Sequence, residues 1–115
     1  MINQWMMTMY RNEKLLASAN GRRCTMCGAM DGTTVAAHSN LLEHGKGRGI
    51  KAHDCFVAYL CHACHTGYDS GHIGQHSFSM AMNRTRAIAK QMGLISDRDV
   101  MDVVLGNYSK IVKRA

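Results

Sequence analysis

Four of the five cysteines stand in two C-x-x-C pairs, and their spacing is the most direct indication of chemistry in the chain. The pairs are Cys24/Cys27 and Cys61/Cys64, and Gly28 follows the first pair directly. Each C-x-x-C turn aims two sulfurs at one point, so two turns offer four thiolates to one ion. Zinc favours this tetrahedral set, and we expect a structural Zn²⁺ that joins two distant knuckles. A redox C-x-x-C is the alternative, but two pairs in one small chain argue against it.

A closed site of four thiolates has no open coordination position, so any catalysis must come from other residues. His38 ends a predicted strand, and His65 directly follows the second cysteine pair. Asp69 lies four residues after His65, so on a helix the two side chains share a face and could bind Mg²⁺ or Mn²⁺. A histidine facing that cation could deprotonate a water for attack on phosphorus, as a metal-dependent phosphodiesterase requires.

Each of these three residues also has a purely structural interpretation. His38 could be an ordinary strand-end histidine, and Asp69 an exposed helix carboxylate. His65 could donate a hydrogen bond to a zinc-bound sulfur. Their position relative to the cysteine pairs favours the catalytic interpretation.

The elements that must position these residues are two short strands and a helix. The stretch 33–38 is rich in β-branched residues, and 56–60 is an apolar run, so each predicts a strand. Glycine alternates with basic residues within 39–54, which predicts a flexible loop. A helix is expected to start within the second cysteine pair and to run to about residue 69.

Helices are expected on both sides of this core, which spans about residues 22–72. Apolar periodicity predicts helices over 2–19 and within 77–105, the last of them opened by a capping box at Ser96. One domain over residues 1–115 accommodates all of these elements. The sequence therefore predicts a small zinc-stapled α+β fold.

The chain is basic, with a formal net charge of +6 at pH 7. A small basic protein most often meets phosphate backbones, although a solvated cationic surface is the alternative. Within the predicted loop, Lys46, Arg48 and Lys51 are the candidate phosphate contacts. No apolar run is long enough to cross a bilayer, and the N-terminal residues do not form an export signal. We therefore expect a reducing location, the cytoplasm.

The order of these motifs resembles the HNH, or ββα-metal, endonucleases. The cysteine spacing is similar to that of phage junction-resolving members, and a closer resemblance is to the small prophage-encoded YbcO-like nucleases. The matching segments are Ala36-Ala37-His38, Gly45-Lys46-Gly47, Asp54, and Cys61-His62-Ala63-Cys64-His65 with Asp69. The resemblance implies that the expected cytoplasm is that of a bacterial host cell.

The resemblance implies a ββα-metal core in which His38 is the general base and His65 and Asp69 are ligands of a catalytic divalent cation. The sequence departs from the pattern of many HNH enzymes at two positions, since Ala37 and Phe56 stand where Asp and Asn are common. Asp54 is therefore a further candidate metal ligand. The YbcO-like group shares a small residue before its histidine, so Ala37 is compatible with activity.

The leading hypothesis is a phage- or prophage-encoded endonuclease that hydrolyses DNA with Mg²⁺ or Mn²⁺, on branched or recombination intermediates by analogy. The second hypothesis is a non-catalytic zinc-containing module that binds nucleic acid, which needs the cysteines and the basic loop but not His38. The third is an adaptor that binds a protein partner through methionine-rich helix faces. A homodimer would suit a double-strand cut, but no residue pattern indicates one.

Overall fold

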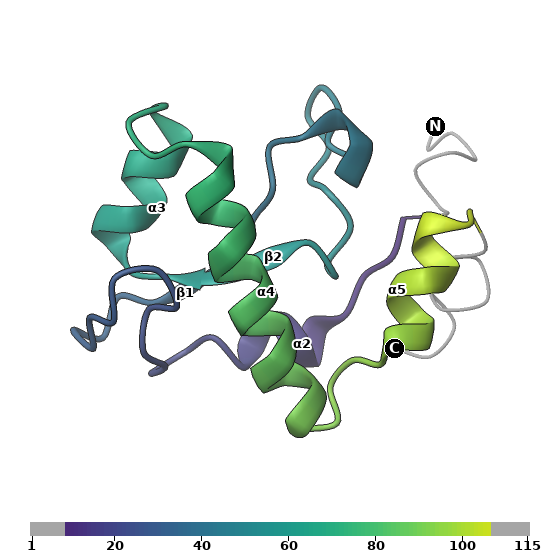
Figure 1. Ribbon diagram of the computed structural model, residues 1–115, viewed down its shortest axis with the longest axis horizontal. Helices are drawn as coiled ribbons and strands as arrows, with labels where there is room; N and C mark the ends of the chain where they lie inside the picture. Colours follow the sequence, from purple (N-terminus) through teal and green to yellow (C-terminus); the bar gives the residue numbers. More distant parts are fainter. Residues whose placement is uncertain (1–8, 107–115) are drawn as a thin grey trace.

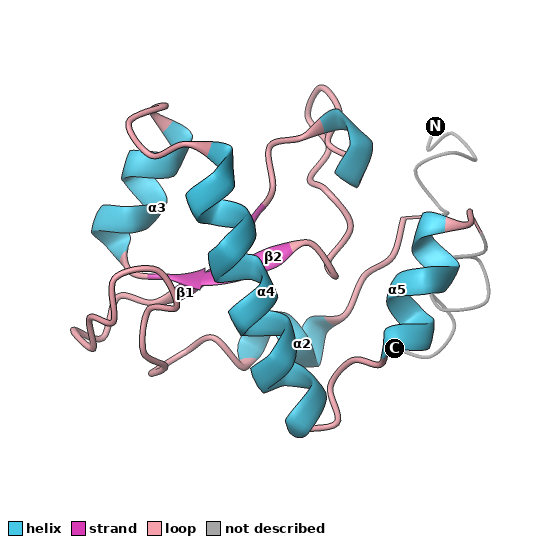
Figure 2. Ribbon diagram, viewed as in Figure 1, coloured by secondary structure: helices cyan, strands magenta, loops and turns pink. Residues whose placement is uncertain are grey.

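The architecture is α+β: a short antiparallel β-hairpin packs against helices (Figures 1 and 2). The computed structural model describes residues 9–106. In chain order the elements are α2 (Glu13–Ala17), β1 (Val35–His38), the 3₁₀ turn η1 (Leu42–His44), β2 (Val57–Leu60), α3 (His62–Asp69), α4 (Gln75–Gln91) and α5 (Asp97–Val104).

The hairpin places the two predicted site segments next to each other. β1 pairs with β2 in a register that sets Val35 opposite Leu60 and His38 opposite Val57. All four residues of β2 are buried, and α4 packs against this strand. Burial of the whole strand explains why its sequence is a continuous apolar run rather than an alternating pattern.

Buried hydroxyl groups join α4 to the hairpin and to the first cysteine pair. Thr85 of α4 accepts a hydrogen bond from the backbone N–H of Tyr59 at 2.9 Å. Its hydroxyl also lies 3.0 Å from the hydroxyl of Thr25. The N–H of Tyr59 is buried and needs an acceptor, and the Thr85 hydroxyl supplies one where no third strand is present.

The apolar core continues from β2 into the interface between α3 and α4. Tyr68 of α3 and Phe78 of α4 stack with ring centroids 4.1 Å apart, and Phe78 is fully buried. Leu15 of α2 and Leu60 of β2 are among the largest buried side chains. Helices α2, α3 and α4 therefore share one core with β2, the strand that leads into α3.

The predicted N-terminal helix over 2–19 is wrong for part of its length. Of the part of this stretch that the structure describes, residues 9–19, only Glu13–Ala17 is helical, with Asn12 as its N-cap. Residues 9–12 are not helical. The N–H of Tyr10 donates to Nδ1 of His53, and its carbonyl accepts from the N–H of Asp54, both at 3.0 Å. These bonds to a distant loop replace the helical ones, a preference that local periodicity does not record. Residues 2–8 of the prediction lie outside the described residues.

The remaining elements are close to the sequence predictions. α4 and α5 occupy the stretch predicted to be helical, and Ser96 and Asp99 form the expected capping box. The strands are each shorter than predicted, at 35–38 and 57–60. Over residues 9–106, no helix is long and apolar enough to cross a membrane.

Candidate metal centre and adjoining histidine pairs

The four paired cysteines converge on one point. Their Sγ atoms all lie within 4.8 Å of one another, and those of Cys27 and Cys61 are 3.6 Å apart. Four sulfurs bound to one zinc at about 2.3 Å, in a tetrahedron, would be about 3.8 Å apart. The predicted cluster is therefore present with a spacing that fits a single zinc ion. Within residues 9–106, no other group of three or more His, Cys, Asp or Glu side chains shares such a spacing.

The backbone of each knuckle prepares this convergence. In the first, the N–H of Gly28 donates to the carbonyl of Cys24 at 3.0 Å, and Gly28 has a φ of 82°. A residue with a side chain would be strained in that left-handed conformation. In the second, Cys61 is the N-cap of α3, and its carbonyl accepts from the N–H of His65 at 2.9 Å. The helix thereby turns Cys64 back toward Cys61.

A direct backbone contact holds the two knuckles together. The N–H and the hydroxyl of Thr25 both donate to the carbonyl of Tyr59, at 2.8 and 3.0 Å. Thr25 lies inside the first C-x-x-C, and Tyr59 lies two residues before Cys61. The hairpin thus sets the distance between the cysteine pairs.

Zinc binding at this cluster must displace protons from thiols in different states. Burial acts to raise the pKa of Cys24, but backbone hydrogen bonds, the largest from Cys27, outweigh it and lower the pKa to about 7. Burial and the neighbouring thiols raise the pKa of Cys64 above its ordinary value. A bound dication stabilises the thiolate form of all four cysteines, including those whose pKa is raised without it. This is the chemistry of a structural zinc site.

The fifth cysteine, Cys55, lies outside the cluster. It is buried, and burial raises its pKa to about 12. A buried neutral thiol is neither a good nucleophile nor a metal ligand. Cys55 is therefore a small apolar residue of the core.

The predicted base His38 contacts the predicted ligand Asp54. Nε2 of His38 lies 2.8 Å from Oδ1 of Asp54. The Asp54 side chain is 2% exposed and that of His38 is 14% exposed. Asp54 also accepts from the N–H of Asn12 at 2.7 Å and from Arg11 at 3.3 Å. A buried carboxylate with these three donors is well satisfied.

The other two predicted residues form a second, more exposed pair. Nε2 of His65 lies 3.1 Å from Oδ2 of Asp69, one turn further along α3. The side chain of Asn40 donates to Oδ1 of Asp69 at 3.2 Å. The N–H of Asn40 donates to the hydroxyl of Tyr68 at 2.9 Å. Asn40 follows His38 by two residues, so these bonds tie the end of β1 to the exposed carboxylate of α3.

The four predicted residues thus occur as two pairs, His38–Asp54 and His65–Asp69. Neither pair acquires a third His, Cys, Asp or Glu ligand among the described residues. The ligand set of a catalytic cation therefore stays a prediction. Its donor types, a carboxylate oxygen and an imidazole nitrogen, suit Mg²⁺ or Mn²⁺ if water and phosphate complete the shell.

The cationic loop folds into a tight turn. Gly47 and Ile50 exchange two backbone hydrogen bonds of 3.0 Å, which places Arg48 at the tip. Arg48 and Lys51 are exposed, and Lys46 is half-buried. Arg48 thus lies within a hydrogen-bonded turn that Lys46 and Lys51 flank. We call these residues the cationic turn, and their contact with DNA stays a prediction.

Sequence reasoning missed the contributions of Arg11, Asn12 and Asn40. Arg11 donates to the carbonyls of Lys51 and Ala52 as well as to Asp54. These partners are about forty residues away, so no local pattern could have signalled them.

No protein-family model, curated protein or solved structure matches this chain. Fold and site together define a small α+β protein with a four-cysteine cluster suited to zinc.

Proposed function

We propose that this protein is a divalent-metal-dependent endonuclease that hydrolyses phosphodiester bonds in DNA. The observation that carries the proposal is the placement of two histidine–aspartate pairs on the hairpin, its loop and α3. His38 ends β1, and Asn40 links the following residues to Asp69 on α3. Two residues span at most about 7 Å, so the backbone of His38 lies close to the residue that bonds Asp69. We infer that the base and the candidate cation-binding pair act on one phosphate.

Each group has a distinct role in the proposed reaction. His38 takes a proton from the attacking water, which contributes about 10²- to 10⁴-fold to such reactions. His65 and Asp69 are the side chains that would hold Mg²⁺ or Mn²⁺. A cation bound there would stabilise the negative charge that develops on the phosphate.

The cysteine cluster supports this site without taking part in the reaction. A zinc ion with four thiolate ligands has no open position for water or phosphate. Its role is to fix the first knuckle against the start of α3, and so to hold His65 and Asp69 relative to β1.

The cationic turn supplies the expected binding surface for DNA. Lys46, Arg48 and Lys51 lie on the loop that connects His38 to Asp54. Lysine and arginine at such positions neutralise phosphates and release counterions, which makes binding dependent on salt. The resemblance to junction-resolving HNH enzymes favours branched or recombination intermediates as substrates.

The second candidate function is a non-catalytic zinc-containing module that binds nucleic acid. One observation favours it: among the described residues, the cysteines are the only group with the full spacing of a metal site. Ala37 and Phe56, at positions where many HNH enzymes carry Asp and Asn, agree with it.

A cleavage assay separates the two candidates. Supercoiled plasmid and a synthetic four-way junction are each incubated with wild type, His38→Ala and His76→Ala, in EDTA, Mg²⁺ or Mn²⁺. His76 is an exposed histidine of α4 and serves as the matched control. An endonuclease requires metal-dependent cutting that His38→Ala loses and His76→Ala retains. Salt-sensitive binding without any His38-dependent cutting of either substrate would favour the binding module.

A further inference from the structure

Asp54 occupies the most enclosed polar position near the proposed site. Its side chain is 2% exposed, and both of its oxygens accept hydrogen bonds. Oδ2 accepts from the N–H of Asn12 at 2.7 Å, and Oδ1 accepts from Arg11 at 3.3 Å. These are obligatory donors, so Asp54 presents an acceptor to its third neighbour, His38.

This arrangement selects one tautomer of His38. Nε2 of His38 lies 2.8 Å from Oδ1 of Asp54, so a neutral ring must carry its proton on Nε2 to donate there. Nδ1 is then the unprotonated nitrogen. No hydrogen bond to Nδ1 occurs within residues 9–106, and the ring stays partly exposed. Among these residues, the nitrogen that can accept a proton from water is thus not occupied by a hydrogen bond.

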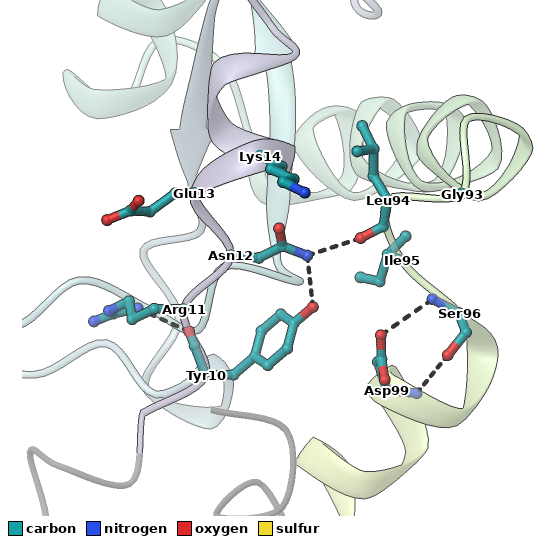
Figure 3. A pocket seen from close by; sticks show the side chains of 10 residues that line it. All are labelled: Tyr10, Arg11, Asn12, Glu13, Lys14, Gly93, Leu94, Ile95, Ser96 and Asp99. Carbon is teal, nitrogen blue, oxygen red and sulfur yellow. Dashed lines mark hydrogen bonds between the residues drawn. The ribbon is translucent and has the colours of Figure 1, made fainter. Parts of the chain in front are cut away.

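Arg11 and Asn12, the residues that donate to Asp54, are themselves held by hydrogen bonds on two sides. Figure 3 shows the Asn12 amide reaching toward the Leu94 carbonyl and the Tyr10 hydroxyl, while the Arg11 side chain extends in the opposite direction. The amide of Asn12 donates to the carbonyl of Leu94 and to the hydroxyl of Tyr10, both at 2.8 Å. On the opposite side, Arg11 holds the loop carbonyls of Lys51 and Ala52. The donors to Asp54 are therefore anchored independently of His38.

We propose that Asp54 is a positioning residue for the general base, not a ligand of the catalytic cation: it holds His38 with Nε2 protonated, so that Nδ1 accepts the proton of the attacking water. This inference rests on the proposed endonuclease function. A cation ligand would need a free lone pair facing solvent, whereas Asp54 is enclosed and shared among three donors. The same division of roles occurs in Ser-His-Asp triads, where a buried Asp fixes the tautomer and orientation of the base.

The substitution Asp54→Asn tests this role at nearly constant shape. With the amide oxygen toward the N–H of Asn12, the NH₂ group faces His38 and forces its proton onto Nδ1. With the amide reversed, its NH₂ group faces the N–H of Asn12, so two donors meet at the position where the wild-type distance is 2.7 Å, shorter than the 2.8 Å to His38. The first orientation is therefore expected, and it blocks the nitrogen that must accept a proton. The equivalent substitution in Ser-His-Asp triads lowers kcat by ~10⁴.

Two measurements are needed. The first is the ring ¹⁵N NMR spectrum of wild type, zinc-loaded and at alkaline pH, with His38 assigned by comparison with His38→Gln. The second is single-turnover cleavage by Asp54→Asn, with DNA affinity and zinc content measured alongside. Asp97→Asn is the matched control, because Asp97 is an exposed aspartate that pairs with Lys90 on the surface.

The expected result is an Nε2-protonated His38 in wild type and an Nδ1-protonated ring in Asp54→Asn. Cleavage should fall about 100-fold or more, with DNA affinity and zinc content unchanged. Asp97→Asn should behave as wild type. A wild-type ring protonated on Nδ1, or full cleavage by Asp54→Asn, would overturn the proposal. If the variant does not fold, the wild-type spectrum alone decides the tautomer.

Failure of the proposed function is visible separately. Cutting by His38→Ala at the wild-type rate would refute the endonuclease mechanism and, with it, the catalytic role of Asp54. The NMR spectrum would still report whether Asp54 orients the ring.

Discussion

If the cysteine cluster holds zinc, loss of its member Cys61 should remove most of the folding stability of this protein. A chain of 115 residues is typically stable by about 6–17 kcal/mol, at roughly 0.05–0.15 kcal/mol per residue. Structural zinc sites contribute about 10–16 kcal/mol at neutral pH. The zinc contribution is therefore of the same size as the whole.

The contacts that remain between the knuckles cannot compensate. Without the ion they are joined directly by two hydrogen bonds from Thr25 to the carbonyl of Tyr59. At about 1 kcal/mol each, these bonds supply about 2 kcal/mol. Cys61→Ala should therefore be unfolded or close to it at room temperature.

The control for this experiment is Cys55→Ala. Cys55 is as buried as Cys61 but lies outside the cluster, so its loss should cost about 1–2 kcal/mol and leave the zinc in place. The assay combines zinc content per chain with thermal unfolding followed by circular dichroism. We expect about one zinc per chain for wild type and Cys55→Ala, and none for Cys61→Ala.

One result would refute the reasoning. A zinc-free Cys61→Ala that melts cooperatively at or above the temperature of Cys55→Ala would show that the cluster does not stabilise the fold. Removal of zinc from wild type with a chelator tests the same point without a substitution, and it should lower the melting temperature.

Three further predictions concern buried polar groups and the cationic turn. Thr85→Val removes the acceptor for the N–H of Tyr59 and should cost about 1–3 kcal/mol in urea unfolding, whereas Thr66→Val, at an exposed site on α3, should be nearly neutral. Burial, followed by the charge of Arg11, lowers the pKa of His53 to about 4, so the fold favours the neutral ring. Its contribution is complete above pH 6.5 and is lost as the pH falls toward 4, by about 3 kcal/mol. His53→Asn, which keeps an acceptor for the N–H of Tyr10, should lose less stability than wild type over that range; equal losses would contradict this assignment. The cationic turn carries Lys46, Arg48 and Lys51. If these side chains contact phosphates, replacing all three with Gln should weaken DNA binding and reduce the slope of log K against log salt concentration by about 0.9 per lost contact. An unchanged slope would argue against this interface.

Several features of the fold could be predicted from local patterns because local physics decides them. The α+β class follows from two short apolar or β-branched runs among helical periodicities. The start of α5 follows from Ser96 and Asp99, whose reciprocal bonds form within one turn. The N-terminal helix was predicted too long because Tyr10 and Asn12 bond instead to residues more than forty positions away.

The site divides in the same way. The four cysteines could be identified from sequence because two C-x-x-C turns carry their geometry within four residues each, and thiolate chemistry then selects the metal. His65 and Asp69 could be paired because helical periodicity places residues four apart on one face. The pairing of His38 with Asp54 was decided by tertiary structure alone, since it depends on the hairpin register and on Arg11 and Asn12. Sequence spacing supplies the types of donor, but which lone pairs are already occupied is known only when the chain has folded around them.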